Sequence, residues 1–274
     1  MSDAASMLEM LRAALGSRAD QLDIVHVPST GSTNADLLEK AREAGAAMRA
    51  QLRVADRQTA GRGRLGRPWH GEPGASLAFS LAWPTRATTL AGLSLAIGVA
   101  AADALDPLPA RRLRIGLKWP NDLWIVGDDE AAGRKLGGIL VETTPAPGGR
   151  IVVVGVGLNI LAQGVPGASS GVGWLREIDA LATPSSALAK VAPALLDALA
   201  RFDSEGFSPF AGRFATRDLL CGRAVRTQAP TGGLPLEGVA CGISAEGELL
   251  LQTAQGMVGI ASGEVSVRPI VGES

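Results

Sequence analysis

The sequence predicts an α+β protein in which a mixed β-sheet backed by helices is followed by a small β-barrel. Short segments with the apolar patterns typical of strands recur between residues 22 and 160. Two long apolar stretches, 90–105 and 185–202, have helical spacing. From Gly222 onward, short strand-like segments alternate with glycine turns, a pattern typical of small barrels and sandwiches. A chain of 274 residues can hold one large domain and a small appendage.

The predicted elements begin with a short helix at 6–15, whose leucines lie on one stripe. The β-branched run at 151–156 predicts a central strand that is buried on both faces. The other expected elements are strands at 22–27, 52–58, 76–83, 112–120, 122–126, 135–144 and 150–160, a helix from the Ser/Thr/Asn cluster at 32–34 to Gly45, and tail strands within 223–228, 236–244, 248–253 and 257–270. We expect an N-terminal segment at 1–21, a main domain at 22–217 and a β domain at 218–274.

Composition argues against several classes of protein. The 26 basic and 27 acidic residues nearly cancel, so bulk attraction to nucleic acid or a membrane surface is not expected. Cys221 and Cys241 lack CxxC spacing and only two histidines accompany them, which argues against a disulfide framework or a structural zinc site. No apolar run is long enough to cross a bilayer, and the acidic start is unlike a signal peptide. We therefore expect a cytoplasmic protein.

The most unusual segment is GRGRLGR at 61–67, which sets three arginines among three glycines after a predicted strand. Glycine lets the backbone approach a ligand closely, and guanidinium groups match carboxylate and phosphate oxygens. The segment is therefore a candidate anion clamp. Two alternatives stay open, an exposed arginine-rich turn and an RNA-binding segment of the Arg-Gly type. It is not a P-loop, because GxxxxGK[ST] is absent.

Two lysines are candidate phosphate ligands. Lys118 and Lys135 bracket a turn, and each is expected at a strand edge, where lysine can act as a point charge. Asp122 in the same turn could orient a lysine, accept a proton or help to hold Mg²⁺. The alternative is an ordinary Pro-Asn-Asp turn with a solvated lysine.

Two other polar positions are ambiguous when taken alone. Asn159 either presents its amide at the mouth of a sheet or simply ends a strand. The cluster Ser32–Thr33–Asn34 is either a helix cap or a set of neutral donors and acceptors for an uncharged polar ligand.

Taken together and in this order, five motifs resemble those of the biotin–protein ligase family. They are GSTN at 31–34, QTAGRGRLGRPW at 58–69, KWPNDL at 118–123, KLGGILVE at 135–142 and GVGLN at 155–159. The resemblance covers residues from about 22 to 217, and the tail resembles the SH3-like domain that closes the family's fold. It implies a biotin/lipoate ligase-like catalytic domain that uses ATP, biotin and Mg²⁺.

The resemblance also implies roles for single residues. It assigns biotin binding to Ser32, Thr33, Asn34, Gln58, Arg62, Gly63, Arg64 and Lys135. It assigns ATP binding to Arg62, Arg64, Arg67, Trp69, Lys118, Asn121, Lys135 and Asn159, and catalysis to Lys135, Arg64 and Asp122. The implied acceptor is a lysine on the biotin carboxyl carrier domain of a biotin-dependent carboxylase. An exposed edge strand could also support a homodimer.

Two features depart from the family pattern. The segment IVGDDEAAG at 125–133 is longer than the compact turn we expect there, which leaves the placement of Lys135 relative to Lys118 open. Only about twenty residues precede the catalytic region, fewer than the winged helix-turn-helix of repressor members needs, so DNA binding is not expected.

Three competing functions remain. A lipoate or octanoate ligase or transferase would share the fold, although GRGRLGRPW with KWPND favours biotin. A nucleic-acid-binding module would use the Arg-Gly loop, but the near-zero net charge and 4% aromatic residues leave it few stacking platforms. A non-catalytic biotin sensor would bind biotin without consuming ATP.

Overall fold

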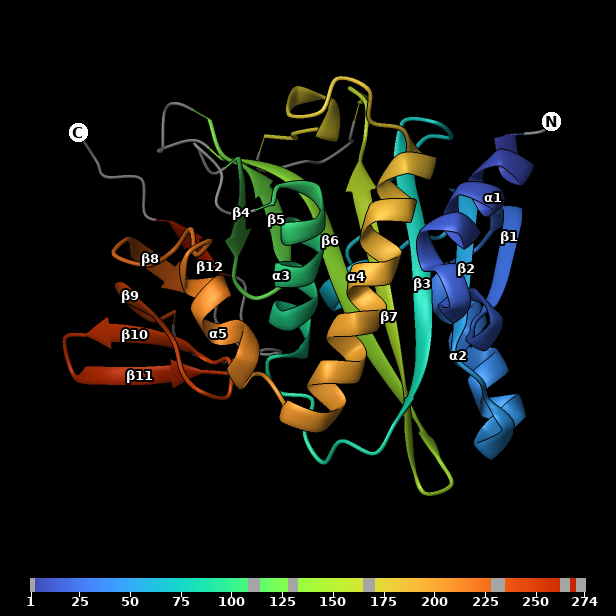
Figure 1. Cartoon of the computed structure of the whole chain (residues 1–274). Coiled ribbons are helices and arrows are strands. Elements are labelled where there is room, and N and C mark those ends of the chain that lie inside the picture. The colour runs from blue at the N-terminus through green and yellow to red at the C-terminus, as the bar shows by residue number, and fades with distance from the viewer. Residues whose placement is uncertain are drawn as a thin grey trace.

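Two β-sheets and five α-helices form the part of the chain described in this computed structural model, residues 3–107, 114–127, 133–164, 171–227, 235–261 and 267–269. The larger sheet has seven strands in the order β1-β2-β3-β7-β6-β5-β4 (Figure 1). Its β1 and β2 pair in parallel, whereas the other neighbours pair antiparallel, which makes the sheet mixed. The α+β class is therefore confirmed.

The strands of this sheet are β1 (Asp23–Thr30), β2 (Gln51–Gln58), β3 (Ser76–Thr85), β4 (Ile115–Lys118), β5 (Asp122–Ile125), β6 (Arg134–Ala146) and β7 (Gly149–Asn159). The helices are α1 (Asp3–Leu15), α2 (Thr33–Ala44), α3 (Leu93–Leu105), α4 (Pro184–Glu205) and α5 (Ser208–Ala215). Short 3-10 turns occupy Gly16–Gln21, Gly45–Ala47, Arg64–Gly66 and Leu175–Glu177. Helix α2 ends as predicted, because Gly45 caps it with a φ of 53°.

Helices cover both faces of the seven-stranded sheet. One face packs against α1, α3 and α4, which lie in front in Figure 1. The other face packs against α2. The central strand β7 contributes side chains to the hydrophobic cores on both faces. Val152 and Val154 belong to the core beneath α1, α3 and α4, and Ile151 and Val153 belong to the core beneath α2. The predicted burial of 151–156 on both faces is confirmed at these four positions.

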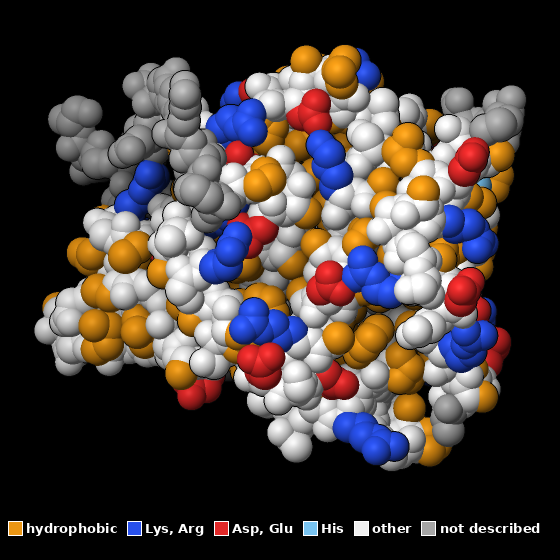
Figure 2. Space-filling view, viewed as in Figure 1, with side chains coloured by type: hydrophobic (Ala, Val, Ile, Leu, Met, Phe, Trp, Pro, Cys, Tyr) orange, Lys and Arg blue, Asp and Glu red, His pale blue; other side chains and the backbone are white. Residues whose placement is uncertain are grey.

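Charges on the surface are mixed in sign. Figure 2 shows lysine, arginine, aspartate and glutamate side chains interspersed over the face that carries α1, α3 and α4. This agrees with the formal net charge of −1. No helix in the described ranges is long and apolar enough to cross a membrane.

The C-terminal strands form a second, antiparallel sheet. Its strands are β8 (Ala224–Thr227), β9 (Glu237–Ile243), β10 (Leu249–Thr253), β11 (Gly256–Ile260) and β12 (Val267–Pro269), in the order β11-β10-β9-β8-β12. The small β domain is confirmed, but its strand order describes an open sheet with β11 and β12 at its edges. Closure into a barrel is thus not seen among the residues described.

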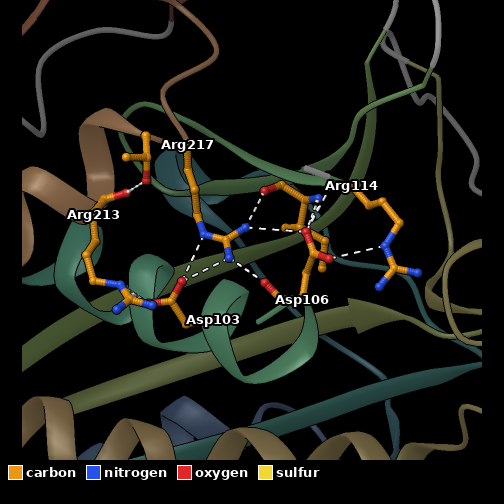
Figure 3. A network of polar contacts seen from close by, with 7 residues as sticks. Asp103, Asp106, Arg114, Arg213 and Arg217 are labelled. Atoms are coloured by element: carbon orange, nitrogen blue, oxygen red, sulfur yellow. Dashed lines mark hydrogen bonds and ion pairs between the residues drawn. The ribbon is translucent and has the colours of Figure 1, made fainter. Parts of the chain in front are cut away.

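A buried arginine joins the end of α3 to β4 (Figure 3). Arg217 is fully buried, pairs with Asp103 and Asp106 at the end of α3, and donates to Ile115 O of β4 at 2.8 Å. Burial opposes ionisation of Asp106, but hydrogen bonds from the Arg114 and Ile115 amides and the Arg114 side chain lower its pKa overall. Trp119, which directly follows β4, links this region to the second sheet, because its Nε1 donates to Gly247 O between β9 and β10 at 3.0 Å.

Two parts of the structure lie beyond the sequence-based expectations. Helix α5 falls between the expected apolar helix and the tail and was not predicted. Within the long segment 125–133, residues 128–132 lie outside the described residues. So do 112–113 of the expected strand 112–120, and 228, 262–266 and 270 of the expected tail strands.

Candidate active site

Glycines on the α2 face of the large sheet leave room for side chains from other segments to contact the strands. An added Cβ on Gly155 would lie 2.3 Å from Asn34 Oδ1, and one on Gly157 would lie 2.4 Å from the Trp69 ring. Gly138, opposite Gly157 on β6, lies beneath Lys135 and Asp122. These glycines let polar and aromatic groups rest directly on the strands, which is the kind of close approach that glycine permits.

The catalytic candidates Lys135 and Asp122 form an ion pair. Lys135 Nζ donates to Asp122 Oδ1 at 2.6 Å, and the two side chains are 33% and 20% exposed. The β5–β6 register shifts here by one residue, because Leu123 pairs with Gly137 but Trp124 pairs with Lys135. This bulge turns Lys135 toward the face that carries Asp122.

Arg64 adds a second cation beside Asp122. Burial lowers the pKa of Arg64; the negative charge of Asp122 opposes this, and the neighbouring Arg67 reinforces it. An anion placed among Arg64, Arg67 and Lys135 would be stabilised by all three charges. The structure therefore brings the three predicted catalytic residues into one charged cluster.

The arginine loop folds back on itself. Gly63 N donates to Arg67 O at 2.7 Å, and Trp69 N donates to Gly61 O at 2.9 Å, so the predicted clamp is a closed loop. Trp69 lies on Gly157, and its indole Nε1 is buried without a hydrogen-bond partner in the described structure. Leu65 at the tip has a positive φ of 56° and is 68% exposed.

The Ser/Thr/Asn cluster begins α2, and its role toward a ligand stays a prediction. Ser32 caps α2 by accepting from the Ala35 amide at 3.4 Å, so the cap interpretation is correct. Thr33 N donates to Gln58 Oε1 at 2.8 Å, which joins the helix start to the end of β2. Ser32, Thr33 and Asn34 are buried, and with Gln58 they make a cluster of neutral donors and acceptors.

Three predicted nucleotide ligands have partners within the protein. Lys118 Nζ lies 4.6 Å from the centroid of the Trp124 ring, a cation–π contact. Asn121 Nδ2 donates to Ile139 O at 2.8 Å, and Asn159 Nδ2 donates to Lys135 O at 3.3 Å. The two amides hold the backbone of β6, so their ATP contacts stay a prediction.

Sequence analysis missed two residues, Ser80 and Glu142, that contact the Ser32–Thr33–Asn34 cluster. Ser80 Oγ lies 2.6 Å from Thr33 Oγ1, and Glu142 Oε2 accepts from Asn34 Nδ2 at 2.9 Å. Glu142 is the last residue of KLGGILVE, so an acidic residue within a matched motif was the available signal. Ser80 lies in an ordinary apolar strand and offered none. The described residues contain no group of three His, Cys, Asp or Glu side chains that could hold a metal.

Comparison with protein families gives two matches. The model described as the biotin/lipoate A/B protein ligase family matches residues 26–159. The model described as the biotin protein ligase C terminal domain matches residues 220–268. The two matches cover the large sheet's strands and most of the second sheet.

Comparison with individual proteins also finds biotin ligases. The chain is 34% identical over 257 residues to the bifunctional ligase/repressor BirA of Salmonella typhimurium, covering 92% of this chain and 76% of that one. It is 35% identical over 259 residues to the biotin–[acetyl-CoA-carboxylase] ligase of Mycobacterium tuberculosis, covering 91% and 90%. A solved structure of the Aquifex aeolicus biotin protein ligase with biotin and ATP superposes with a TM-score of 0.72 at 28% identity, covering 90% of this chain and 99% of that one.

Proposed function

This chain belongs to the biotin/lipoate A/B protein ligase family, and from that membership we propose that it is an ATP-dependent biotin–protein ligase. It forms biotinyl-5′-AMP from biotin and ATP, releases pyrophosphate, and transfers biotin to a lysine of an acceptor protein. The observation that carries the proposal is the cluster of Lys135, Asp122 and Arg64 on the same face as a pocket of neutral polar side chains.

The first half-reaction brings two anions together. A carboxylate oxygen of biotin attacks the α-phosphorus of ATP, the bond to the β-phosphate oxygen breaks, and pyrophosphate leaves. Lys135 and Arg64 offset the repulsion between carboxylate and phosphate and stabilise charge on the phosphoryl oxygens. The incoming anions compete with Asp122 for Lys135, whose ammonium group already lies within the site.

The second half-reaction consumes the mixed anhydride. The amine of the acceptor lysine attacks the acyl carbon, AMP leaves, and the nitrogen loses a proton. Asp122 is the carboxylate placed to orient that amine or receive the proton. The arginine loop, with Arg62, Gly63 and Arg64, retains the adenylate and excludes water that would hydrolyse it.

The neutral pocket suits the biotin head group. A cyclic urea needs uncharged donors and acceptors, which Ser32, Thr33, Asn34 and Gln58 supply directly or by holding one another. Arg67, Trp69, Lys118, Asn121 and Asn159 are our candidates for the nucleotide side.

Mg²⁺ fits this site as a partner of ATP. Asp122 is the carboxylate within the charged cluster, and one carboxylate with phosphate oxygens is a usual ligand set for Mg²⁺. The metal would supply charge neutralisation on the phosphates.

The remaining assignments extend this proposal. The acceptor is a biotin carboxyl carrier domain of a biotin-dependent carboxylase, and the enzyme acts in the cytoplasm without binding nucleic acid. A homodimer through an exposed sheet edge is compatible with the fold. We assign 22–217 to the catalytic domain, 218–274 to the SH3-like domain and 1–21 to an N-terminal segment.

Exchange of labelled pyrophosphate into ATP tests the first half-reaction. Exchange should require biotin, and lipoate or octanoate should not replace it. Exchange with lipoate or octanoate alone would assign the enzyme to lipoyl or octanoyl chemistry instead. Folded protein that shows no exchange with any of the three acids would contradict the ligase assignment.

A further inference from the structure

Glu142 joins the polar pocket at the start of α2 to the arginine loop. Its carboxylate accepts from Asn34 Nδ2 through Oε2 at 2.9 Å, and its Oε1 lies 3.2 Å from Arg62 Nη2. Asn34 is 3% exposed, whereas Arg62 is 44% exposed. The Glu142 side chain on β6 therefore connects the buried Asn34 to the exposed arginine loop.

The strand register explains why Glu142 reaches both groups. Residues directly opposite each other on β6 and β7 point to the same face, and Glu142 is opposite Val153, which packs beneath α2. Two residues further along β7, Gly155 leaves the space in which the Asn34 amide lies. Glu142 is thus on the same face as the glycine-lined site.

Glu142 also determines which way the Asn34 amide points. Asn34 Nδ2 lies 2.9 Å from Glu142 Oε2 and 3.3 Å from Leu140 O, and both of these atoms only accept hydrogen bonds. Asn34 Oδ1 accepts from Ser80 Oγ at 2.5 Å. A flipped amide would place its oxygen against two acceptors and its NH₂ group against the Ser80 hydroxyl.

The hydrogen-bond network continues to Gln58. Ser80 donates its one hydroxyl proton to Asn34, so Thr33 Oγ1, which lies 2.6 Å from Ser80 Oγ and 3.1 Å from Gln58 Oε1, has two acceptors for its own proton. The Gln58 oxygen Oε1 then accepts from the Thr33 backbone amide at 2.8 Å. This arrangement leaves Nε2 as the donor end of Gln58.

We propose that Glu142 is a positioning residue that sets the donor and acceptor order of the biotin pocket and links that pocket to the arginine loop. The proposal rests on the ligase function above. A cyclic urea presents its N–H donors and its carbonyl acceptor at fixed places, so a pocket with reversed amides would offer it mismatched groups. Glu142 acts through Asn34 and Arg62 and does not itself touch biotin.

The variant Glu142→Gln tests this role. Glutamine has the same shape but only one acceptor oxygen, so its NH₂ group must face either Asn34 or Arg62, both of which are donors. We expect the KM for biotin in pyrophosphate exchange to rise by about 10-fold or more, and the KM for ATP, to which Arg62 is also assigned, to rise several-fold less. A residue that only supports the fold would not separate the two constants.

A second variant changes the hydrogen bond at the other end of the Asn34 amide. Ser80→Ala removes the donor to Asn34 Oδ1 and leaves Glu142 and Arg62 unchanged. It should raise the KM for biotin selectively as well. The control is Glu205→Gln, which breaks the exposed pair with Arg201 on α4, across the sheet from α2, and should leave both constants unchanged.

The outcomes separate the two proposals. Wild-type protein without biotin-dependent exchange would reject the function itself. Active wild-type protein with folded variants whose KM for biotin is unchanged, or rises by the same factor as that for ATP, would reject the positioning role. If Glu142→Gln does not fold, Ser80→Ala, which removes a single oxygen atom, decides the question.

Discussion

Lys135 Nζ and Asp122 Oδ1 lie 2.6 Å apart because one residue of β6, Leu136, is bulged out of the ladder with β5. Side chains alternate along a strand, so without the bulge Lys135 would point to the face opposite Gly138 and Glu142. The bulge places a cation beside a carboxylate on the glycine-lined face. The site therefore depends on an irregularity of one strand.

Lys135 and Asp122 should act in different half-reactions. Lys135→Ala should lower biotin-dependent pyrophosphate exchange by about 100-fold or more, because a charge that stabilises the phosphoryl oxygens is lost. Asp122→Asn should keep more of the exchange, because phosphate oxygens and water would supply most of the Mg²⁺ ligands and an amide oxygen can still contribute one. It should mainly slow transfer to the acceptor, measured as biotin incorporated into a carrier domain. The control Lys190→Ala removes an exposed lysine paired with Asp179 and should affect neither reaction. Equal loss of both reactions in Asp122→Asn would contradict the separation.

Gly157 should tolerate no side chain. A Cβ there would lie 2.4 Å from the Trp69 ring, so Gly157→Ala must displace Trp69 and the arginine loop. We expect a rise of about 10-fold or more in the KM for biotin or ATP. The matched control is Gly212→Ala in α5, where a Cβ meets nothing within 4 Å and helix propensity favours alanine. Unchanged kinetics in Gly157→Ala would show that Trp69 does not support the site.

Arg217 should contribute far more to stability than its neighbour Arg213, although both pair with Asp103. Arg217 is fully buried, and its removal takes a cation from Asp103 and Asp106 and a donor from the backbone carbonyls of Ile115 and Asp106, so Arg217→Met should cost about 3–5 kcal/mol. The Arg213 side chain is 52% exposed, so Arg213→Met should cost about 0–1 kcal/mol. Urea unfolding of the two variants measures the difference. Similar losses would mean that the buried network is not coupled to folding.

Asp218 should make folding less favourable as the pH rises. Burial raises its pKa, and backbone hydrogen bonds from Leu220 and Cys221 only partly oppose this. Between the ordinary value of 3.8 and the raised value, the folded state binds more protons than the unfolded state, so stability falls with increasing pH through that window. Relative to Asp218→Asn, the wild type should therefore lose stability on going from acidic to neutral pH.

Asp179 provides a control of opposite sign for this titration. A hydrogen bond from Lys190 lowers the pKa of Asp179, so its contribution is present above the ordinary value of 3.8 and is lost as the pH falls through the lowered one. Urea unfolding from acidic to neutral pH should show opposite trends for Asp218→Asn and Asp179→Asn, each relative to wild type. Parallel trends would contradict the assignment of these two carboxylates.

Local pattern was sufficient for most of the fold. The alternation at 76–83, the β-branched run at 151–156 and the cap and stop of α2 at Ser32 and Gly45 depend on nearby residues, and the structure confirms them. Helix α5 was missed because it has only eight residues, too few for helical spacing to stand out. The strand order β11-β10-β9-β8-β12 of the second sheet was not predicted, because strand pairing is a long-range property.

The sequence by itself determined the order of elements, the mixed α+β class and the motifs that name a family. The tertiary structure alone decided how the site is assembled: the bulge that aims Lys135 at Asp122 and the contact of Glu142 with both Asn34 and Arg62. It also decided the burial of Arg217 against α3 and β4. The physical reason is that periodicity and capping act over a few residues. Hydrogen bonds such as that between Asn34 and Glu142 join residues about a hundred positions apart, and only the completed sheet brings them into contact.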